Sequence, residues 1–255
     1  MEIIAISSMK GGVGKTTTAV HLAYLSAAAG WRTLLWDLDP QGGATYSLGV
    51  DASLNASVKK LVRGDQELHE SIVDTPFENL DLLPGDFSLR RMDVHLHERK
   101  HPTQRLLKMS RSLRSHYAAL FIDCAQGMSL LTENVLRAAD ALVVPLIPSP
   151  LSVRMLDELS AFIEQHGWRD LVLLPFFSMV DRRRQLHREF IAATRERHPG
   201  ILATEVPYWS EIERMTVRRA PLPAIAPRSP AAQIYVALWN EIDERLQRDR
   251  SRPAG

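Results

Sequence analysis

One nine-residue segment constrains the fold of this chain more than any other. Residues 10–18 read KGGVGKTTT and follow directly on the apolar run IIAIS at residues 3–7. The ordinary phosphate-binding loop has the pattern G-x-x-x-x-G-K-[ST] between a strand and a helix. Here the usual first glycine is missing, and Lys10 lies in the loop in addition to Lys15. A strand, a glycine-rich loop and a helix in this order predict a nucleotide-phosphate site on an α/β domain.

Short apolar runs alternate with helical segments along the chain. The apolar runs are mostly continuous rather than alternating, which is typical of parallel strands covered on both faces. Strands are predicted over residues 3–7, 33–37, 80–83, 118–123, 141–145, 171–177 and 202–206. Helices are predicted over residues 17–29, 132–139, 152–165, 185–197 and 230–248. The alternation predicts an α/β fold with a doubly wound, mostly parallel sheet and helices on both faces, of the P-loop NTPase type.

The composition limits the classes of protein that fit. The chain has 255 residues, 45% of them hydrophobic, which suffices for one large domain with a full core. We expect a single P-loop domain over residues 1–248 and a frayed tail over residues 249–255. The formal net charge of +1 excludes a polybasic binder, so any nucleic-acid contact must come from a local patch. The single cysteine, Cys124, excludes a disulfide framework and a Cys-rich metal site within one chain.

No segment of the sequence has the pattern of an export signal or a membrane span. The first apolar run is too short for a signal peptide and leads straight into the glycine-rich loop. No stretch approaches the roughly 18 consecutive apolar residues that a membrane helix needs. We therefore expect a cytoplasmic protein.

The loop carries the chemistry of phosphate binding. Its glycines let backbone N–H groups approach the phosphates, and the helix that starts near Lys15 directs its positive end at them. Lys15 is expected to contact the β- and γ-phosphates, and the Thr16 hydroxyl to ligate Mg²⁺. Since Lys15 already serves its own site, Lys10 is free to reach a nucleotide held by another subunit. The predicted nucleotide-binding loop residues are Lys10, Gly11, Gly12, Val13, Gly14, Lys15, Thr16 and Thr17.

Two acidic strand ends complete the predicted site, because ligands bind at the carboxyl ends of the strands in such sheets. The segment DLDPQGG at residues 37–43 places Asp39 where it could orient an attacking water. The segment ALFIDC is an apolar strand ending in Asp123, a Walker B pattern that holds the Mg²⁺ shell. Taken alone, each acidic end is also typical of an ordinary turn. The nucleotide base is assigned, from residue types alone, to residues 176–181 and the turn at Pro207.

The set KGGVGKTTT, DLDPQGG, FIDC and ADALVVPLIPS resembles the ParA/MinD family of deviant Walker A ATPases, in that family's order and spacing over nearly the whole chain. The resemblance is greatest to ParA/Soj-type partition or cargo-positioning members. It implies slow, partner-stimulated hydrolysis of ATP with Mg²⁺, and a face-to-face homodimer on ATP binding. In that dimer Lys10 crosses to the partner's phosphates and Gly11 packs at the contact. The implied catalytic residues are Lys10, Lys15 and Asp39, and the implied metal positions are Thr16, Asp39 and Asp123.

Two short segments depart from the family pattern. After Cys124 the family usually has a proline pair, and this chain has Ala125 and Gln126. That segment lies near the γ-phosphate, so we expect the nucleotide switch to be tuned differently. Gly42 and Gly43 stand where Gly-Asn is usual. Neither departure removes a phosphate or Mg²⁺ ligand.

A basic segment favours the DNA-binding branch of the family. Partition members bind non-specific DNA as ATP dimers, through a stretch that reads roughly D-x-R-T-N-L. Residues 181–186 read DRRRQL, so Arg183 falls at the DNA-contacting arginine. The arginines expected after Pro207 are absent, and Tyr208 and Trp209 stand there. The alternative is a solvated helix whose arginines contact no DNA. The candidate DNA-binding residues are Arg183, Arg184, Arg188, Arg214, Arg218 and Arg219.

Other segments weigh against rival functions. Residues 90–116 are basic and include His95 and His97, but without a Cys or carboxylate cluster a surface helix that contributes to DNA or partner binding fits better than a metal site. The last helix carries an apolar stripe opposite acidic residues, so we expect it to pack on the domain rather than bind a membrane. A single cysteine argues against a cluster shared between subunits.

These observations predict a ParA-like, nucleoid-associated ATPase. Its ATP-sandwich homodimer would bind non-specific DNA and position or segregate a cargo, which is a chromosome, a plasmid or a protein assembly such as a carboxysome. An adaptor protein would stimulate hydrolysis and release the dimer, and no membrane contact is expected. The alternative is a MinD-like membrane-cycling ATPase for division-site or flagellar placement. A metabolic P-loop ligase would need a substrate motif, and none is visible.

Overall fold

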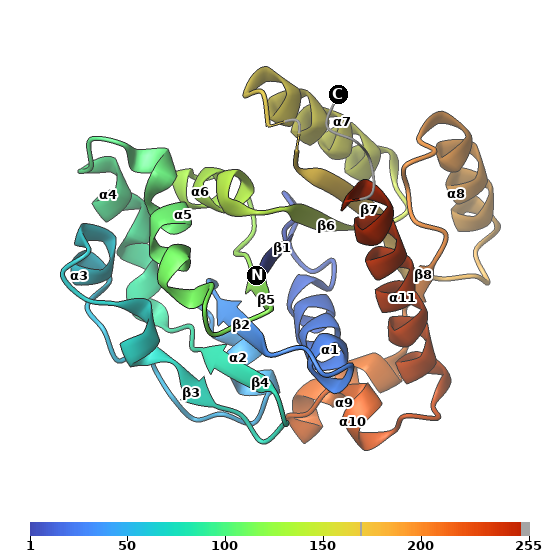
Figure 1. The fold of residues 1–255 in the computed structure, drawn as a ribbon. Helices are drawn as coiled ribbons and strands as arrows, with labels where there is room; N and C mark the ends of the chain where they lie inside the picture. The colour runs from blue at the N-terminus through green and yellow to red at the C-terminus, as the bar shows by residue number, and fades with distance from the viewer. Residues whose placement is uncertain (169, 251–255) are drawn as a thin grey trace.

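The computed structural model describes residues 1–168 and 170–250, and within them eight strands form one sheet (Figure 1). The strand order is β3-β4-β2-β5-β1-β6-β7-β8. Neighbouring strands run parallel, except that β3 is antiparallel to β4 at the edge. The bounds are β1 Glu2–Ile6, β2 Thr33–Asp37, β3 Val73–Asp74, β4 Leu80–Leu83, β5 Ala119–Asp123, β6 Ala141–Leu146, β7 Val172–Val180 and β8 Glu205–Pro207.

Helices cover both faces of this sheet. The helices of one face are α1 Lys15–Ala28, α2 Gly43–Ser47, α9 Ser210–Arg218, α10 Leu222–Ile225 and α11 Pro230–Arg250. Those of the other face are α3 Val58–Arg63, α4 Met92–His97, α5 Arg105–Met109, α6 Leu130–Ala138, α7 Pro150–Gln165 and α8 Gln185–Arg197. Short 3₁₀ turns are η1 Leu68–Ser71, η2 Phe87–Arg91, η3 Pro102–Gln104 and η4 Ser110–Leu113.

The continuous apolar strands supply two separate cores. Successive residues of a strand face opposite sides of the sheet, so Ile3 and Ala5 of β1 enter one core while Ile4 and Ile6 enter the other. All four side chains are fully buried. The doubly wound α/β fold predicted from the sequence is confirmed.

The structure differs from the predicted elements in several places. Helices α2, α3, α9 and α10 were not predicted, and β8 begins at Glu205 rather than at residue 202. Strand β3 has only two residues and was not predicted. The basic segment 90–116, expected as a surface helix, is broken into short α and 3₁₀ turns that bury Leu96 and Leu106. Helix α11 continues through residues 249 and 250, where we expected the frayed tail to begin. The remaining tail residues, 251–255, lie outside the described residues.

Helix α11 packs against the sheet rather than standing free. Its residues Leu238 and Ile242 are fully buried, and Tyr235 and Leu246 are each 2% exposed. Among the described residues, no helix combines the length and apolar composition required to cross a bilayer.

The strand order sets the place of the site. Strand β1 lies between β5 and β6. The next strand in sequence, β2, lies on the β5 side of β1, whereas β6, β7 and β8 lie on its other side. Parallel sheets open a crevice at the carboxyl ends of the strands where the order reverses in this way. The loop after β1 lies at such a point, because it lines one cavity together with residues that follow β2 and β5 and with Met179 near the end of β7.

Candidate nucleotide-binding site

The glycine-rich loop joins β1 to the N-terminus of α1. Gly12 and Gly14 have φ values of +69° and +89°, in the left-handed region that glycine adopts without strain. Gly14 is the N-cap of α1, and no side chain caps the helix there. The first N–H groups of a 14-residue helix therefore stay available for an anion. Lys15, in the first turn, is only 8% exposed.

Two carboxylates meet at the ends of neighbouring strands. Asp37 of β2 pairs in register with Asp123 of β5, and both side chains are fully buried. Asp37 is satisfied, because it accepts hydrogen bonds from the Thr45 N–H and hydroxyl, both at 2.8 Å, and from the Asp39 N–H at 3.2 Å. Burial raises the pKa of Asp37 to about 6, and the bonds from Thr45 oppose that rise. Asp37 is thus a structural group that holds the start of α2.

Asp123 is in the opposite situation. Neither of its carboxylate oxygens has a hydrogen-bond partner among the described residues. Burial raises the pKa of Asp123 well above its usual range, and the nearby Asp37 raises it further, while the Thr16 hydroxyl and Lys15 lower it. An unpaired buried carboxylate is costly, and a hard cation with oxygen ligands offsets that cost. Asp123 and the Thr16 hydroxyl therefore fit a Mg²⁺ ion.

Mg²⁺ at this position would depend on phosphate oxygens for its other ligands. Among the described residues, no three His, Cys, Asp or Glu side chains gather into a group that could hold a metal without them. Mg²⁺ commonly binds through one or two protein oxygens together with substrate phosphates. The donor set is that of a nucleotide-dependent metal site rather than a permanent one.

Asp39 lies on the wall of a cavity of about 550 Å³. Its carboxylate accepts a hydrogen bond of 2.9 Å from the Gln41 N–H, which fixes the turn. The cavity is lined by Gly11, Gly12, Gly14, Lys15, Thr16, Thr17, Asp39, Gln41, Ala125, Gln126 and Met179. The structure thus places most of the predicted loop residues and Asp39 around one space. Val13 is buried in the core instead.

Close packing requires glycine at positions 42 and 43. Gly42 has a φ of +63°, and a Cβ there would lie 2.9 Å from the Gly85 carbonyl oxygen. A Cβ at Gly43 would lie 3.2 Å from Cγ2 of Thr16. Gly42 therefore lets the turn after Asp39 approach the backbone that follows β4, and Gly43, the departure from the family pattern, lets it approach Thr16 next to the phosphate loop.

A smaller apolar cavity of about 190 Å³ adjoins the first. The two share Gly14, Thr17 and Met179 as lining residues. Its other walls come from β8, the loop that follows β8, α9 and α11, and they include Val206, Pro207, Tyr208, Trp209, Ile212 and Tyr235. Apolar and aromatic walls beside a phosphate cavity suit a nucleotide base. Pro207, assigned to the base from sequence, lines this cavity, whereas Phe176 and Phe177 are buried in the cores.

Met179 lies within the segment 176–181 that the sequence assigned to the base, and it lines both cavities with a φ of +56° that is uncommon outside glycine. The aromatic pair Tyr208 and Trp209 was not assigned to the site from sequence. Tyr208 and Trp209 are 57% and 37% exposed. An exposed aromatic pair directly after a strand-ending proline was the available signal, because such pairs often mark binding surfaces.

Lys10 is separated from the other loop residues. It does not line the 550 Å³ cavity that contains Lys15. It lines a narrow recess beside β6 and α7, together with Met9, Val13, Leu146 and Met155. Lys10 is half-buried, and its backbone N–H bonds the Ser8 hydroxyl at 3.3 Å. Lys10 and Lys15 therefore do not line the same cavity.

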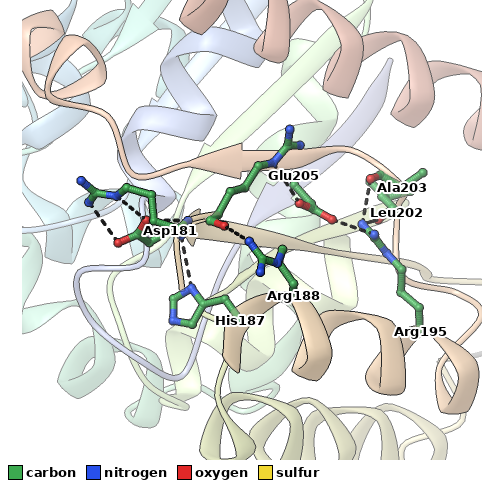
Figure 2. A network of polar contacts seen from close by, with 9 residues as sticks. Asp181, His187, Arg188, Arg195, Leu202, Ala203 and Glu205 are labelled. Atoms are coloured by element: carbon green, nitrogen blue, oxygen red, sulfur yellow. Dashed lines mark hydrogen bonds and ion pairs between the residues drawn. The ribbon is translucent and has the colours of Figure 1, made fainter. Parts of the chain in front are cut away.

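The arginines of the segment around α8 divide into two groups, shown in Figure 2. Arg195 is engaged internally, with an ion pair of 2.8 Å to Glu205 and bonds to the carbonyls of Leu202 and Ala203. The Arg183 side chain is 89% exposed. Among the described residues, its guanidinium bonds only the Asp181 carboxylate, through Nε at 2.9 Å and Nη2 at 3.1 Å. Arg188 is also exposed, and its Nη1 donates to the Arg182 carbonyl at 2.9 Å.

The remaining candidate DNA-binding arginines differ in exposure. Arg184, Arg214 and Arg218 are exposed. Arg219 is not free, because its guanidinium donates to the Asp51 carboxylate and to the carbonyls of Tyr46 and Val50. The DNA contact of Arg219 stays a prediction, and in this structure its guanidinium is engaged within the chain. It clamps the end of α9 to the loop after α2.

A third cavity joins the basic segment to the aromatic pair. This groove of about 530 Å³ is lined by residues 180–183 on one side and residues 207–211 on the other. Pro207, Tyr208 and Trp209 therefore line both this groove and the apolar cavity. The two surfaces share one wall.

Similar proteins are known for nearly the whole chain. A family model described as an AAA domain (AAA_31) matches residues 1–169. The chain is 31% identical to the sporulation initiation inhibitor protein Soj of Bacillus subtilis, over 94% of this chain and 98% of Soj. It is 29% identical to the chromosome partitioning protein ParA of Caulobacter vibrioides, over 100% of this chain and 98% of that protein. The fold is also similar to the structure of cobyrinic acid a,c-diamide synthase from Mycobacterium smegmatis with a bound ATP analogue and magnesium. The two superpose with a TM-score of 0.82 over 100% of this chain and 98% of that one, and their sequences are 27% identical.

Proposed function

The chain belongs to the ParA/MinD family of deviant Walker A ATPases, and we propose that it acts as an ATP-dependent switch on DNA. In this proposal an ATP-sandwich homodimer binds non-specific DNA and positions or segregates a cargo. The cargo is a chromosome, a plasmid or a protein assembly such as a carboxysome. An adaptor protein stimulates hydrolysis and so releases the dimer from the nucleoid.

The observation that carries the ATPase chemistry is the unpaired Asp123 beside the phosphate loop. Lys15 and the N–H groups at the start of α1 bind the β- and γ-phosphates. The Thr16 hydroxyl and Asp123 hold Mg²⁺, with Asp39 nearby on the cavity wall. When bound, Mg²⁺ neutralises charge on the transferring phosphoryl group. Asp39 aligns the attacking water at the same end of the cavity.

The separate position of Lys10 supports dimerisation. A second lysine that served its own nucleotide would line the same cavity as Lys15, and Lys10 does not. Supplied to the partner's γ-phosphate, it would add positive charge where negative charge develops in the transition state. Dimerisation would then depend on the nucleotide, because the lysine gains its partner only when ATP is present in the facing site.

The exposed arginines support DNA over membrane binding. Arg183, Arg184, Arg188, Arg214 and Arg218 offer charge to phosphates without sequence readout. The MinD-like alternative needs a free amphipathic helix. The apolar stripe of α11 is buried against the sheet, with Leu238 and Ile242 fully covered. That burial leaves no apolar face of the described part of α11 for a lipid surface.

Co-sedimentation tests the proposal directly. The protein is spun with plasmid DNA or with anionic liposomes, each with ATP, ADP or no nucleotide, at two salt concentrations. We expect ATP-dependent DNA retention that weakens with salt, and no liposome retention. Retention on liposomes alone would favour the membrane-cycling alternative.

A charge reversal tests the DNA surface. Arg183→Glu is expected to abolish DNA retention while ATP binding stays intact. Arg248→Glu is the matched control, because Arg248 is exposed and pairs with a local acid, Glu244, as Arg183 pairs with Asp181. Unchanged retention of Arg183→Glu at moderate salt would remove this residue from the DNA surface.

A further inference from the structure

We propose that Gln126 is a catalytic residue of ATP hydrolysis, whose carboxamide orients the attacking water at the terminal phosphate. The inference rests on the proposed ATPase function and deepens it. In the reaction the water oxygen bonds to the γ-phosphorus as the bond from that phosphorus to the β–γ bridging oxygen breaks. ADP keeps the electron pair, one water proton remains on the released phosphate, and the other passes to solvent.

Gln126 lies against the phosphate loop itself. A Cβ at Gly11 would lie 2.1 Å from Oε1 of Gln126, closer than any real contact allows. The carboxamide therefore rests on the bare backbone of Gly11, in space that only a glycine leaves open. Gln126 also lines the 550 Å³ cavity that contains Lys15, Thr16 and Asp39.

The cavity has two distinguishable ends. Gly14, Thr17 and Met179 border the apolar cavity that suits the base. Gly11 and Gln126 line the phosphate cavity and do not border the apolar one. Because a bound nucleotide runs from base to terminal phosphate, Gln126 is placed at the phosphate end, where hydrolysis occurs.

The backbone around Gln126 is fixed on both sides. The Cys124 N–H donates to the Ile6 carbonyl at 3.1 Å, and the Gly127 N–H donates to the Ser8 carbonyl at 3.3 Å. The Gly127 carbonyl in turn accepts a bond of 3.1 Å from the Thr132 hydroxyl. Gly127 has a φ of +97°, which turns the chain sharply after Gln126. The segment is thus tied to the end of β1 and to α6, while the Gln126 side chain is exposed to the cavity.

The chemistry of a carboxamide suits this position. It accepts a hydrogen bond through its oxygen and donates through its nitrogen, so it can hold a water while contacting a phosphate oxygen. A glutamine orients the attacking water in several phosphate-hydrolysing enzymes. The proline usual at this position in the family pattern offers neither function. Gln126 therefore adds a polar group to the reaction end of the site in addition to Asp39.

The test separates chemistry from binding. Single-turnover hydrolysis of radiolabelled ATP and equilibrium binding of ATP are measured for the wild type, Gln126→Ala and Met128→Ala. Met128 is the matched control because it lies two residues further on, is 37% exposed and does not line the cavity. We expect Gln126→Ala to slow hydrolysis by roughly 10- to 100-fold, with ATP affinity within about 3-fold of the wild type, and Met128→Ala to leave both unchanged.

A second variant tests the contact with Gly11. Gly11→Ala places a methyl group where the carboxamide rests, so it should displace Gln126 and slow hydrolysis. If both changes act through one group, the double variant should be no slower than the slower single variant. Fully additive losses would instead indicate that Gln126 acts independently of this contact, and would overturn the placement.

Three outcomes overturn the inference. Hydrolysis by Gln126→Ala within 2-fold of the wild type would remove Gln126 from the reaction. A loss confined to ATP affinity would make Gln126 a binding residue only. Absence of ATP hydrolysis in the wild type would overturn the proposed function as well, and so is distinguishable from the first two results.

Discussion

The buried His21 predicts a specific loss of stability in acid. His21 lies on α1, fully buried, and stacks on Tyr235 of α11 with ring centroids 3.9 Å apart. Its Nδ1 lies 2.6 Å from the Thr17 carbonyl oxygen, and its Nε2 lies 3.1 Å from the Leu222 N–H. A carbonyl only accepts and an N–H only donates, so the neutral ring with its proton on Nδ1 satisfies both partners. A second proton, on Nε2, would face the Leu222 donor.

The size of the effect follows from the pKa. Burial lowers the pKa of His21 from 6.5 to about 4, and the bond to the Thr17 carbonyl opposes that change. Above pH 6.5 the ring is neutral in both states, so the full stability is present. As the pH falls toward 4, the unfolded chain takes up a proton that the folded chain refuses. At about 1.4 kcal/mol per pKa unit the full loss is about 3 kcal/mol, of which about 2 kcal/mol appears between pH 7.5 and pH 5.

Urea unfolding at a series of pH values measures this loss. Other groups titrate over the same range, so the quantity compared is the pH dependence of the wild type minus that of His21→Gln. We expect the difference in unfolding free energy to shrink by about 2 kcal/mol between pH 7.5 and pH 5. His116→Gln is the control, since His116 is exposed. Parallel pH profiles for the wild type and His21→Gln would refute the argument that His21 is held neutral.

Two further variants probe the nucleotide site. Lys10→Ala should lose the ATP-dependent dimer in light scattering while still binding ATP, with the exposed Lys59→Ala as control; a normal dimer would contradict the in-trans role. Asp123→Asn should weaken Mg²⁺-dependent ATP binding by at least about 10-fold, because it removes a ligand charge, and should leave ADP binding in EDTA nearly unchanged. Equal weakening with and without Mg²⁺ would instead indicate a folding defect.

Strong local patterns were sufficient to predict much of the fold. Strand β2 and helix α8 lie at the residues expected, 33–37 and 185–197, because a short continuous apolar run is typical of a buried parallel strand and a longer amphipathic segment is typical of a helix. Strand β3 had no such signal. It has two residues and pairs antiparallel only with β4, so a tertiary contact alone defines it.

The basic segment 90–116 shows how packing overrides composition. The break between η3 and α5 is stabilised by the fully buried Asn134 of α6, whose side chain donates to the Pro102 carbonyl at 2.7 Å and accepts from the Arg105 N–H at 2.9 Å. Those bonds replace the helical bonds that a continuous helix would have made. Pro102 marks this break in the sequence, because proline ends a helix at the preceding residue. The bonds to Asn134, some 30 residues away, are a tertiary feature that no local pattern predicts.

The phosphate side of the site was predictable because a contiguous motif encodes it. The base side was assigned only in part, because Met179 and Pro207 lie in the segments named from sequence, whereas the other walls are brought together from α1, α9 and α11. Arg219 illustrates the same limit for the basic surface. Its charge alone suggested a phosphate contact, whereas the fold brings Asp51 to it across 168 residues of sequence.

Two of the departures from the family pattern fall on the walls of the phosphate and apolar cavities and spare the predicted ligands. Ala125 and Gln126 line the phosphate cavity, and Tyr208 and Trp209 line the apolar one. Lys15, Thr16 and Asp123 are retained, so the residues predicted to bind phosphate and Mg²⁺ are kept. The departures leave room for a change in the rate of hydrolysis and in the contacts with the nucleotide. Tyr208 and Trp209 also line the groove that contains Arg183. A base that bound against this shared wall would also move residues that line the groove. In the proposed function, that contact is the most direct link between the nucleotide state and DNA retention.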